Sequence, residues 1–122
     1  MRVLIVDDSR FVRNFLRGLL EGMGFECGEA ADGKAGMEQL EAGPAFDLVL
    51  LDWNMPVMNG LEMLRQLRAG GFTELKVMMV TTEAENDFIL NALEAGADEY
   101  LMKPFDEEAL TEKLAMLGLA EV

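Results

Sequence analysis

The sequence predicts an α/β fold built on a doubly wound parallel sheet, and two observations support this prediction. Apolar runs alternate with helical patterns five times along the 122 residues, as expected for five successive βα units. Two of the runs, Leu48–Leu51 and Val77–Val80, are continuously apolar, which is typical of parallel strands covered by helices on both faces. Right-handed crossovers then give a flavodoxin-like (βα)5 sheet with strand order 2-1-3-4-5.

The strands are short apolar runs bounded by polar or glycine-containing segments. The five expected strands are Arg2–Val6, Glu26–Ala30, Leu48–Leu51, Lys76–Val80 and Tyr100–Met102.

The helices are predicted from apolar side chains that recur at helical spacing. The first begins after Ser9, a plausible N-cap, and ends near Gly22 and Gly24. The next three are expected at about 33–41, 61–69 and 84–95. The last follows Pro104-Phe105, where Asp106, Glu107 and Glu108 suit the positive end of a helix dipole.

Composition excludes several classes of function. We expect one domain, residues 1–122, with no output domain. The net charge of −13 repels phosphate backbones and anionic membranes, so no nucleic acid and no membrane insertion are expected. The chain has no histidine, and its one cysteine, Cys27, allows no internal disulfide. The apolar run within Met1–Asp8 is too short for a signal peptide, so a cytoplasmic protein is expected. We also expect it to be a monomer.

Charged side chains follow three of the predicted strands. Asp7 and Asp8 follow the first, Asp52 follows the third, and Lys103 follows the fifth. In an open α/β sheet these strand ends converge on one crevice, where ligands bind. Carboxylates that meet there repel one another unless a cation joins them. The pattern therefore indicates a small acidic, metal-binding site with one lysine.

Five motifs, in order, carry a resemblance to a known family. They are Val3–Ser9, Leu51–Pro56, Asn59-Gly60, Val80–Ala84 and Tyr100–Phe105. In this respect the chain resembles a response-regulator receiver domain, most of all the single-domain chemotaxis type (CheY-like), over essentially its whole length. A P-loop motif, G-x-x-x-x-G-K-[ST], is absent from the sequence.

The resemblance implies a phosphoacceptor and a magnesium site. Asp52 would be the phosphoacceptor, and Mg²⁺ would bind Asp8 and Asp52 directly, the backbone carbonyl of Asn54, and Asp7 through water. Lys103 would hold the phosphoryl oxygens as a point charge, although it could instead serve to neutralise the acid pair.

The resemblance also implies a switch. The Thr81 hydroxyl would bond the phosphoryl oxygens, and Tyr100 would rotate into the vacated space. Asn54 and Glu83 would tune the rate of hydrolysis, and Lys103-Pro104 would be a cis peptide bond. We expect Trp53 to be a partly exposed loop aromatic with no chemical role.

The implied function is a two-component signalling switch that catalyses only its own phosphorylation and dephosphorylation. The phosphodonor would be a CheA-like histidine kinase or a small phosphodonor. The downstream partner would be a flagellar motor switch protein, a phosphatase or a phosphotransfer protein. Two alternatives stay open: a phosphate-shuttle receiver in a phosphorelay, and an aspartate-nucleophile phosphatase. The predicted fourth helix opens with Glu85, Asn86 and Asp87 where chemotaxis receivers often carry lysines, which weakens the case for a motor partner.

Overall fold

The computed structural model describes residues 1–82 and 86–120. Within this part of the chain, strands and helices alternate strictly along the sequence. The elements are β1 (Arg2–Val6), α1 (Arg10–Gly22), β2 (Glu26–Ala30), α2 (Gly33–Ala42), β3 (Leu48–Asp52), α3 (Gly60–Ala69), β4 (Lys76–Thr81), α4 (Asn86–Glu94), β5 (Glu99–Met102) and α5 (Glu107–Met116).

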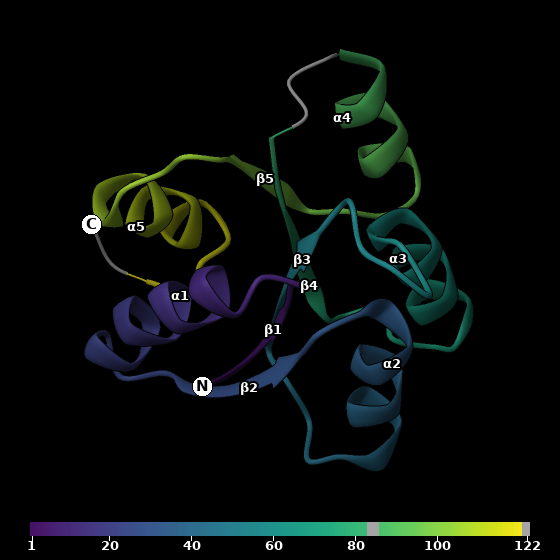
Figure 1. The fold of residues 1–122 in the computed structure, drawn as a ribbon, viewed down its shortest axis with the longest axis horizontal. Helices are drawn as coiled ribbons and strands as arrows, with labels where there is room; N and C mark the ends of the chain where they lie inside the picture. The colour runs from purple at the N-terminus through teal and green to yellow at the C-terminus, as the bar shows by residue number, and fades with distance from the viewer. Residues whose placement is uncertain (83–85, 121–122) are drawn as a thin grey trace.

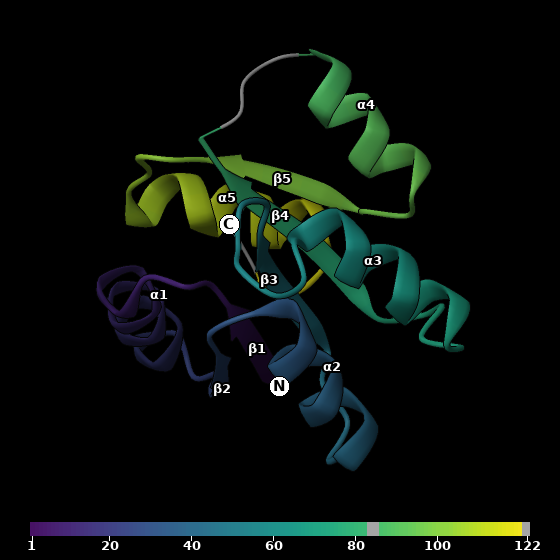
Figure 2. The same cartoon turned by 45° about the vertical axis from the view of Figure 1, so that its right-hand side comes forward.

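The strands form one parallel sheet in the order β2-β1-β3-β4-β5, which confirms the predicted fold class. Helices α1 and α5 cover one face of the sheet, and α2, α3 and α4 cover the other (Figures 1 and 2). Because all strands run the same way, the loops that follow β1, β3 and β5 open at one edge of the sheet. The four charged groups singled out in the sequence therefore converge there.

Two hydrophobic clusters, one on each face, hold the sheet between its helices. On one face Leu16 and Leu20 of α1 pack with Leu110 and Leu114 of α5. On the other face α2, α3 and α4 cover a cluster that contains Val49, Leu51 and Val77, among other residues. Strand β3 is buried along its whole length, and its last residue, Asp52, pairs with Val80 of β4.

The strand ends differ slightly from those predicted. β3 and β4 each continue one residue further, to Asp52 and Thr81, and β5 begins one residue earlier, at Glu99. The ladder explains the first two extensions, since Asp52 pairs with Val80, and Thr81 with Met102. The predicted start of the fourth helix, Ala84, lies outside the described residues.

Trp53 corrects one prediction. It was expected to be partly exposed, but it is only 8% exposed. Its ring meets the ring of Phe88 edge to face at 5.3 Å, so α4 covers it. The loop after β3 thus contributes to the core. No helix in the described ranges is long and apolar enough to cross a membrane.

Candidate functional site

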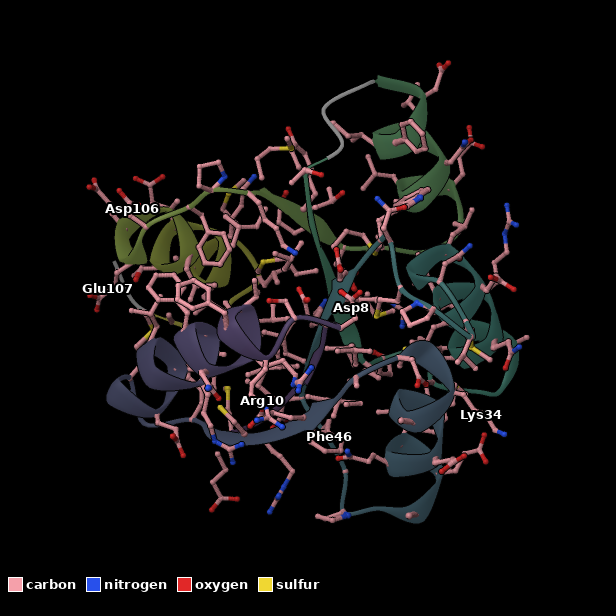
Figure 3. All side chains as sticks on the ribbon, viewed as in Figure 1. Asp8, Arg10, Lys34, Phe46, Asp106 and Glu107 are labelled. Carbon is pink, nitrogen blue, oxygen red and sulfur yellow. The ribbon has the colours of Figure 1, made fainter. Side chains whose placement is uncertain are left out.

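The loop after β1 holds one carboxylate inside the protein and leaves the next outside. Asp7 is 2% exposed, and its backbone N–H donates to the carbonyl of Ala30 at 3.1 Å. One oxygen of its carboxylate accepts the N–H of Ser9 at 2.9 Å. Asp8 is exposed and lies near the centre of the molecule in Figure 3. The site can therefore be reached from solvent through Asp8.

The loop after β3 places Asp52 at the end of a buried strand. Asp52 is only 7% exposed. The loop turns back so tightly that a Cβ atom on Gly60 would lie 2.2 Å from the carbonyl oxygen of Asp52. The N–H of Gly60 donates to the carbonyl of Trp53 at 2.9 Å. Only glycine fits this position, and this explains the Asn59-Gly60 motif in physical terms.

A capping box fixes the start of α3 just beyond this turn. The Asn59 side chain accepts the N–H of Glu62, and the Glu62 side chain accepts the N–H of Asn59. This reciprocal pair satisfies two donors at the helix terminus. The loop that carries Asn54, which is exposed, is thereby anchored at both ends.

Lys103 joins the two buried carboxylates. Its Nζ donates to Oδ2 of Asp7 at 2.9 Å and lies 3.4 Å from Oδ1 of Asp52. Its backbone N–H donates to the carbonyl of Thr81 at 2.8 Å, which continues the β4–β5 ladder. The bond from Lys103 to Pro104 is cis, as predicted. The nearer partner of the lysine is Asp7, whereas the sequence directed attention to Asp52.

The electrostatic balance of the site remains negative. Burial, together with the charge of Asp7, raises the pKa of Asp52 to about 6, although Lys103 acts in the opposite direction. Burial disfavours the charged ammonium of Lys103, but its hydrogen bond to Asp7 and the charge of Asp52 outweigh this, and the pKa of Lys103 is raised. One cation, bound to Asp7 and Asp52, thus faces a cluster of three acids.

A divalent metal fits this arrangement. Asp7, Asp8 and Asp52 can each offer a carboxylate oxygen, and these oxygens lie within 4.8 Å of one another. An all-oxygen donor set with an open, solvent-facing side suits Mg²⁺, which prefers oxygen ligands and keeps several waters. A second cation would also relieve the repulsion that raises the pKa of Asp52.

Thr81 and Tyr100 line the same small cavity, away from the carboxylates. Thr81 is buried at the end of β4, and Tyr100 is half-buried on β5. Trp53 and Phe88 also line this cavity, which has a volume of about 10 Å³. Nζ of Lys113 lies 4.5 Å from the centre of the Tyr100 ring.

The structure therefore brings together Asp7, Asp8, Asp52 and Lys103, and it puts Thr81 on the strand next to Asp52. Glu83, expected to tune hydrolysis, lies outside the described residues. Sequence reasoning missed the burial of Trp53. It also missed Arg13, whose guanidinium donates to the carbonyl of Asp7 at 2.6 Å. Arg13 lies in the first turn of α1, where the helix dipole disfavours a cation, and this anomaly could have indicated a local partner.

Comparison with known proteins identifies what the chain resembles. The sequence profile of the response regulator receiver domain matches residues 3–115. The chemotaxis protein CheY of Pseudomonas aeruginosa is 42% identical over 116 residues, which cover 93% of each chain. The structure of Vibrio cholerae CheY4 superimposes with a TM-score of 0.89 and 33% identity, covering 94% of this chain and 96% of that one. A CheX-CheY-BeF3-Mg²⁺ complex from Borrelia burgdorferi gives a TM-score of 0.92 at 28% identity, covering 97% and 89%.

Proposed function

This chain belongs to the response regulator receiver domain family, and from that premise we propose that it is a chemotaxis-type signalling switch that is phosphorylated on Asp52. The observation that carries the proposal is the meeting of three carboxylates within 4.8 Å, two of them also bound by one lysine. Such a site can accept a phosphoryl group only if its negative charge is offset.

The proposed metal ligands are those that the family resemblance implies. Asp8 and Asp52 would bind Mg²⁺ directly, with the backbone carbonyl of Asn54, and Asp7 would act through water. When bound, Mg²⁺ neutralises the carboxylates and the incoming phosphoryl oxygens. Asp7 already accepts hydrogen bonds from Ser9 and Lys103, which suits a carboxylate that orients water better than one that binds a metal directly.

The proposed transfer is a displacement at phosphorus. A carboxylate oxygen of Asp52 forms the new O–P bond while the P–N bond of a phosphohistidine breaks, and the imidazole leaves with its electron pair. Lys103 stabilises the phosphoryl oxygens as a point charge. Hydrolysis reverses the modification: water attacks phosphorus, the O–P bond breaks, and inorganic phosphate and the Asp52 carboxylate are released.

The proposed output uses the cavity shared by Thr81 and Tyr100. A hydrogen bond from the Thr81 hydroxyl to a phosphoryl oxygen would draw this side chain toward Asp52. The space it leaves adjoins Tyr100, so the ring could move inward and change the surface formed by α4, β5 and α5. One local charge-assisted bond would then bias a two-state element.

The proposed partners follow from the chemistry and from the relatives. The chain has no histidine, so a phosphohistidine donor has to be another protein, a CheA-like kinase in this proposal. The Borrelia relative binds CheX, and a phosphatase, phosphotransfer protein or motor protein is a matching class of downstream partner. Of the described α4 and α5 residues, Lys113 is the one lysine. This favours a phosphate-shuttle role as the second candidate.

A turnover enzyme is the weaker interpretation. Aspartate-nucleophile phosphatases usually need an acid two residues after the nucleophile, and here that residue is Asn54, an amide that does not exchange a proton in this way. We propose a switch that catalyses only its own phosphorylation and dephosphorylation.

The test is a covalent modification assay. The protein is incubated with acetyl phosphate, with and without Mg²⁺, and intact mass is measured alongside Asp52→Asn. We expect a phosphoryl adduct that needs Mg²⁺ and Asp52, and a change in the fluorescence of Trp53, the only tryptophan, when Mg²⁺ or beryllofluoride is added. An adduct that persists in Asp52→Asn, or no adduct in the unaltered protein, would contradict the proposal.

A further inference from the structure

We propose that Arg13 is a positioning residue for the metal ligand Asp8, an inference that rests on the proposed function. The Arg13 side chain is 14% exposed and spans two acceptors on different elements. Nη1 donates to the backbone carbonyl of Asp7 at 2.6 Å, and Nε donates to Oε1 of Glu29 at 3.1 Å. The guanidinium thus ties the loop that carries the acid pair to strand β2.

The carbonyl of Asp7 is the group that controls where Asp8 points. A peptide unit is planar, so fixing this oxygen also fixes the N–H and Cα of Asp8. The other polar groups of Asp7 are already held by hydrogen bonds. Its N–H donates to the carbonyl of Ala30, and its carboxylate accepts from the Ser9 N–H and from Lys103. The Asp8 side chain is exposed and relies on its backbone for orientation. Arg13 therefore restrains the peptide unit that precedes Asp8, just as the bond from the Ser9 N–H to the Asp7 carboxylate restrains the unit that follows it.

Glu29 makes Arg13 rigid enough for this task. Its backbone carbonyl accepts from the side chain of Gln39 on α2, an anchor that does not depend on Arg17, whose guanidinium binds the other carboxylate oxygen of Glu29. Residues that orient metal ligands in this indirect way typically change metal affinity about 10- to 100-fold when they are removed.

Charge alone predicts the opposite effect. Arg13 is a cation in the first turn of α1, where the helix dipole is positive, and it lies beside a site proposed to bind another cation. If it acted only through its charge, its removal would strengthen Mg²⁺ binding. A positioning role predicts weaker binding, so the sign of the change separates the two explanations.

Arg17 provides a matched control. It lies one turn further along α1, carries the same charge and also binds Glu29, but its remaining contacts are the carbonyl of Cys27 at 2.8 Å and the carboxylate of Glu21 at 3.5 Å, neither of which belongs to the acidic site. Removing Arg17 changes the net charge equally and leaves the bond to Asp7 in place.

The experiment measures the dissociation constant for Mg²⁺ at constant ionic strength, from the fluorescence of Trp53, in the unaltered protein, Arg13→Met, Arg13→Lys and Arg17→Met. We expect about 10-fold weaker binding in Arg13→Met and unchanged binding in Arg17→Met. Arg13→Lys keeps the charge but lacks a planar fork that can bridge two acceptors, so we expect an intermediate loss. Hydrogen exchange in metal-free protein should be faster at the amides of Asp8 and Ser9 in both Arg13 variants.

Three results would decide against the inference. Mg²⁺ binding by Arg13→Met that is equal to or tighter than that of the unaltered protein overturns it, and so does an equal weakening in Arg17→Met. If Arg13→Met does not fold, unchanged affinity and exchange in Arg13→Lys overturn it equally well. Absence of Mg²⁺ binding in the unaltered protein refutes the proposed function instead, and the exchange at Asp8 and Ser9 then still tests whether Arg13 orders this loop.

Discussion

Replacing Asp52 by asparagine should make the metal-free protein more stable while abolishing its proposed function. The ordinary pKa of an aspartate here is 3.8, and burial together with the charge of Asp7 raises that of Asp52 to about 6. Since each pKa unit corresponds to about 1.4 kcal/mol, keeping Asp52 ionised near pH 7.5 costs about 3 kcal/mol of folding free energy. Asparagine is nearly the same size and carries no charge.

The attraction of Lys103, 3.4 Å away, is already contained in the pKa of Asp52, which it lowers, so the loss to set against the gain is the burial of an amide in place of the carboxylate. Lys103 keeps its closer contact with Asp7, at 2.9 Å. We therefore expect Asp52→Asn to raise the free energy of unfolding by about 1–3 kcal/mol, or the melting temperature by several degrees for a domain of this size.

The stability difference between the two proteins should depend on pH, in a direction set by the pKa of Asp52. Asp52 has a higher pKa in the folded state than in the unfolded chain, so between these values the folded state binds the proton that the unfolded chain has released. The unaltered protein is therefore stabilised, relative to Asp52→Asn, as pH falls through about 6. The difference in unfolding free energy between the two proteins should be largest above pH 7 and close to zero near pH 4.

The assay is urea or thermal unfolding of both proteins with EDTA and with Mg²⁺. Mg²⁺ should stabilise the unaltered protein by mass action and should stabilise Asp52→Asn less. The reasoning is refuted if Asp52→Asn is no more stable than the unaltered protein in EDTA at pH 7.5, or if the difference between them does not shrink on acidification.

Three further predictions concern the frame around the site. Lys103→Gln should lower the free energy of unfolding by about 3 kcal/mol in EDTA, because it leaves Asp7 buried without its cation; urea titration measures this, and tighter Mg²⁺ binding should accompany it. Gly60→Ala should lower stability by several kcal/mol and weaken Mg²⁺ binding, since the new Cβ would lie 2.2 Å from the carbonyl oxygen of Asp52; normal values for both would contradict the role of this turn. Arg68→Met should lower stability by about 2–4 kcal/mol, because charged donors to backbone carbonyls are lost, but leave the Mg²⁺ dissociation constant unchanged. The carbonyls concerned are those of Phe72, Leu75 and Gly96.

The fold could be predicted because its signals are local. Each strand is a short apolar run, each helix has its own apolar spacing, and a parallel sheet follows from their alternation. The convergence of Asp7, Asp8, Asp52 and Lys103 then required one general rule, that the carboxyl ends of parallel strands share an edge. These residues lie close together in the structure for that reason.

What the sequence did not indicate depends on contacts between distant elements. Trp53 is buried because Phe88, on a helix 35 positions later in the chain, covers it. Arg13 reaches Glu29 across the gap between α1 and β2, and no periodicity in either element predicts that pair. The apolar periodicity of the sequence predicts which face of a helix or strand a residue lies on. Which side chain it contacts there depends on how the whole domain packs.

The sequence left two interpretations of Lys103 open, and the observed contacts of this lysine are compatible with both. The lysine lies closer to Asp7 than to Asp52, so in the metal-free protein its nearer partner belongs to the acid pair, in line with the simpler interpretation. Yet its ammonium also faces the proposed phosphoacceptor at 3.4 Å, at the distance from which a point charge acts on an oxygen bound to Asp52. Asp7 is held by Ser9 as well, so it keeps Lys103 at the site in either state. A lysine anchored on Asp7 can act on a phosphoryl group carried by Asp52, and this gives the second buried carboxylate a role in the proposed phosphorylation.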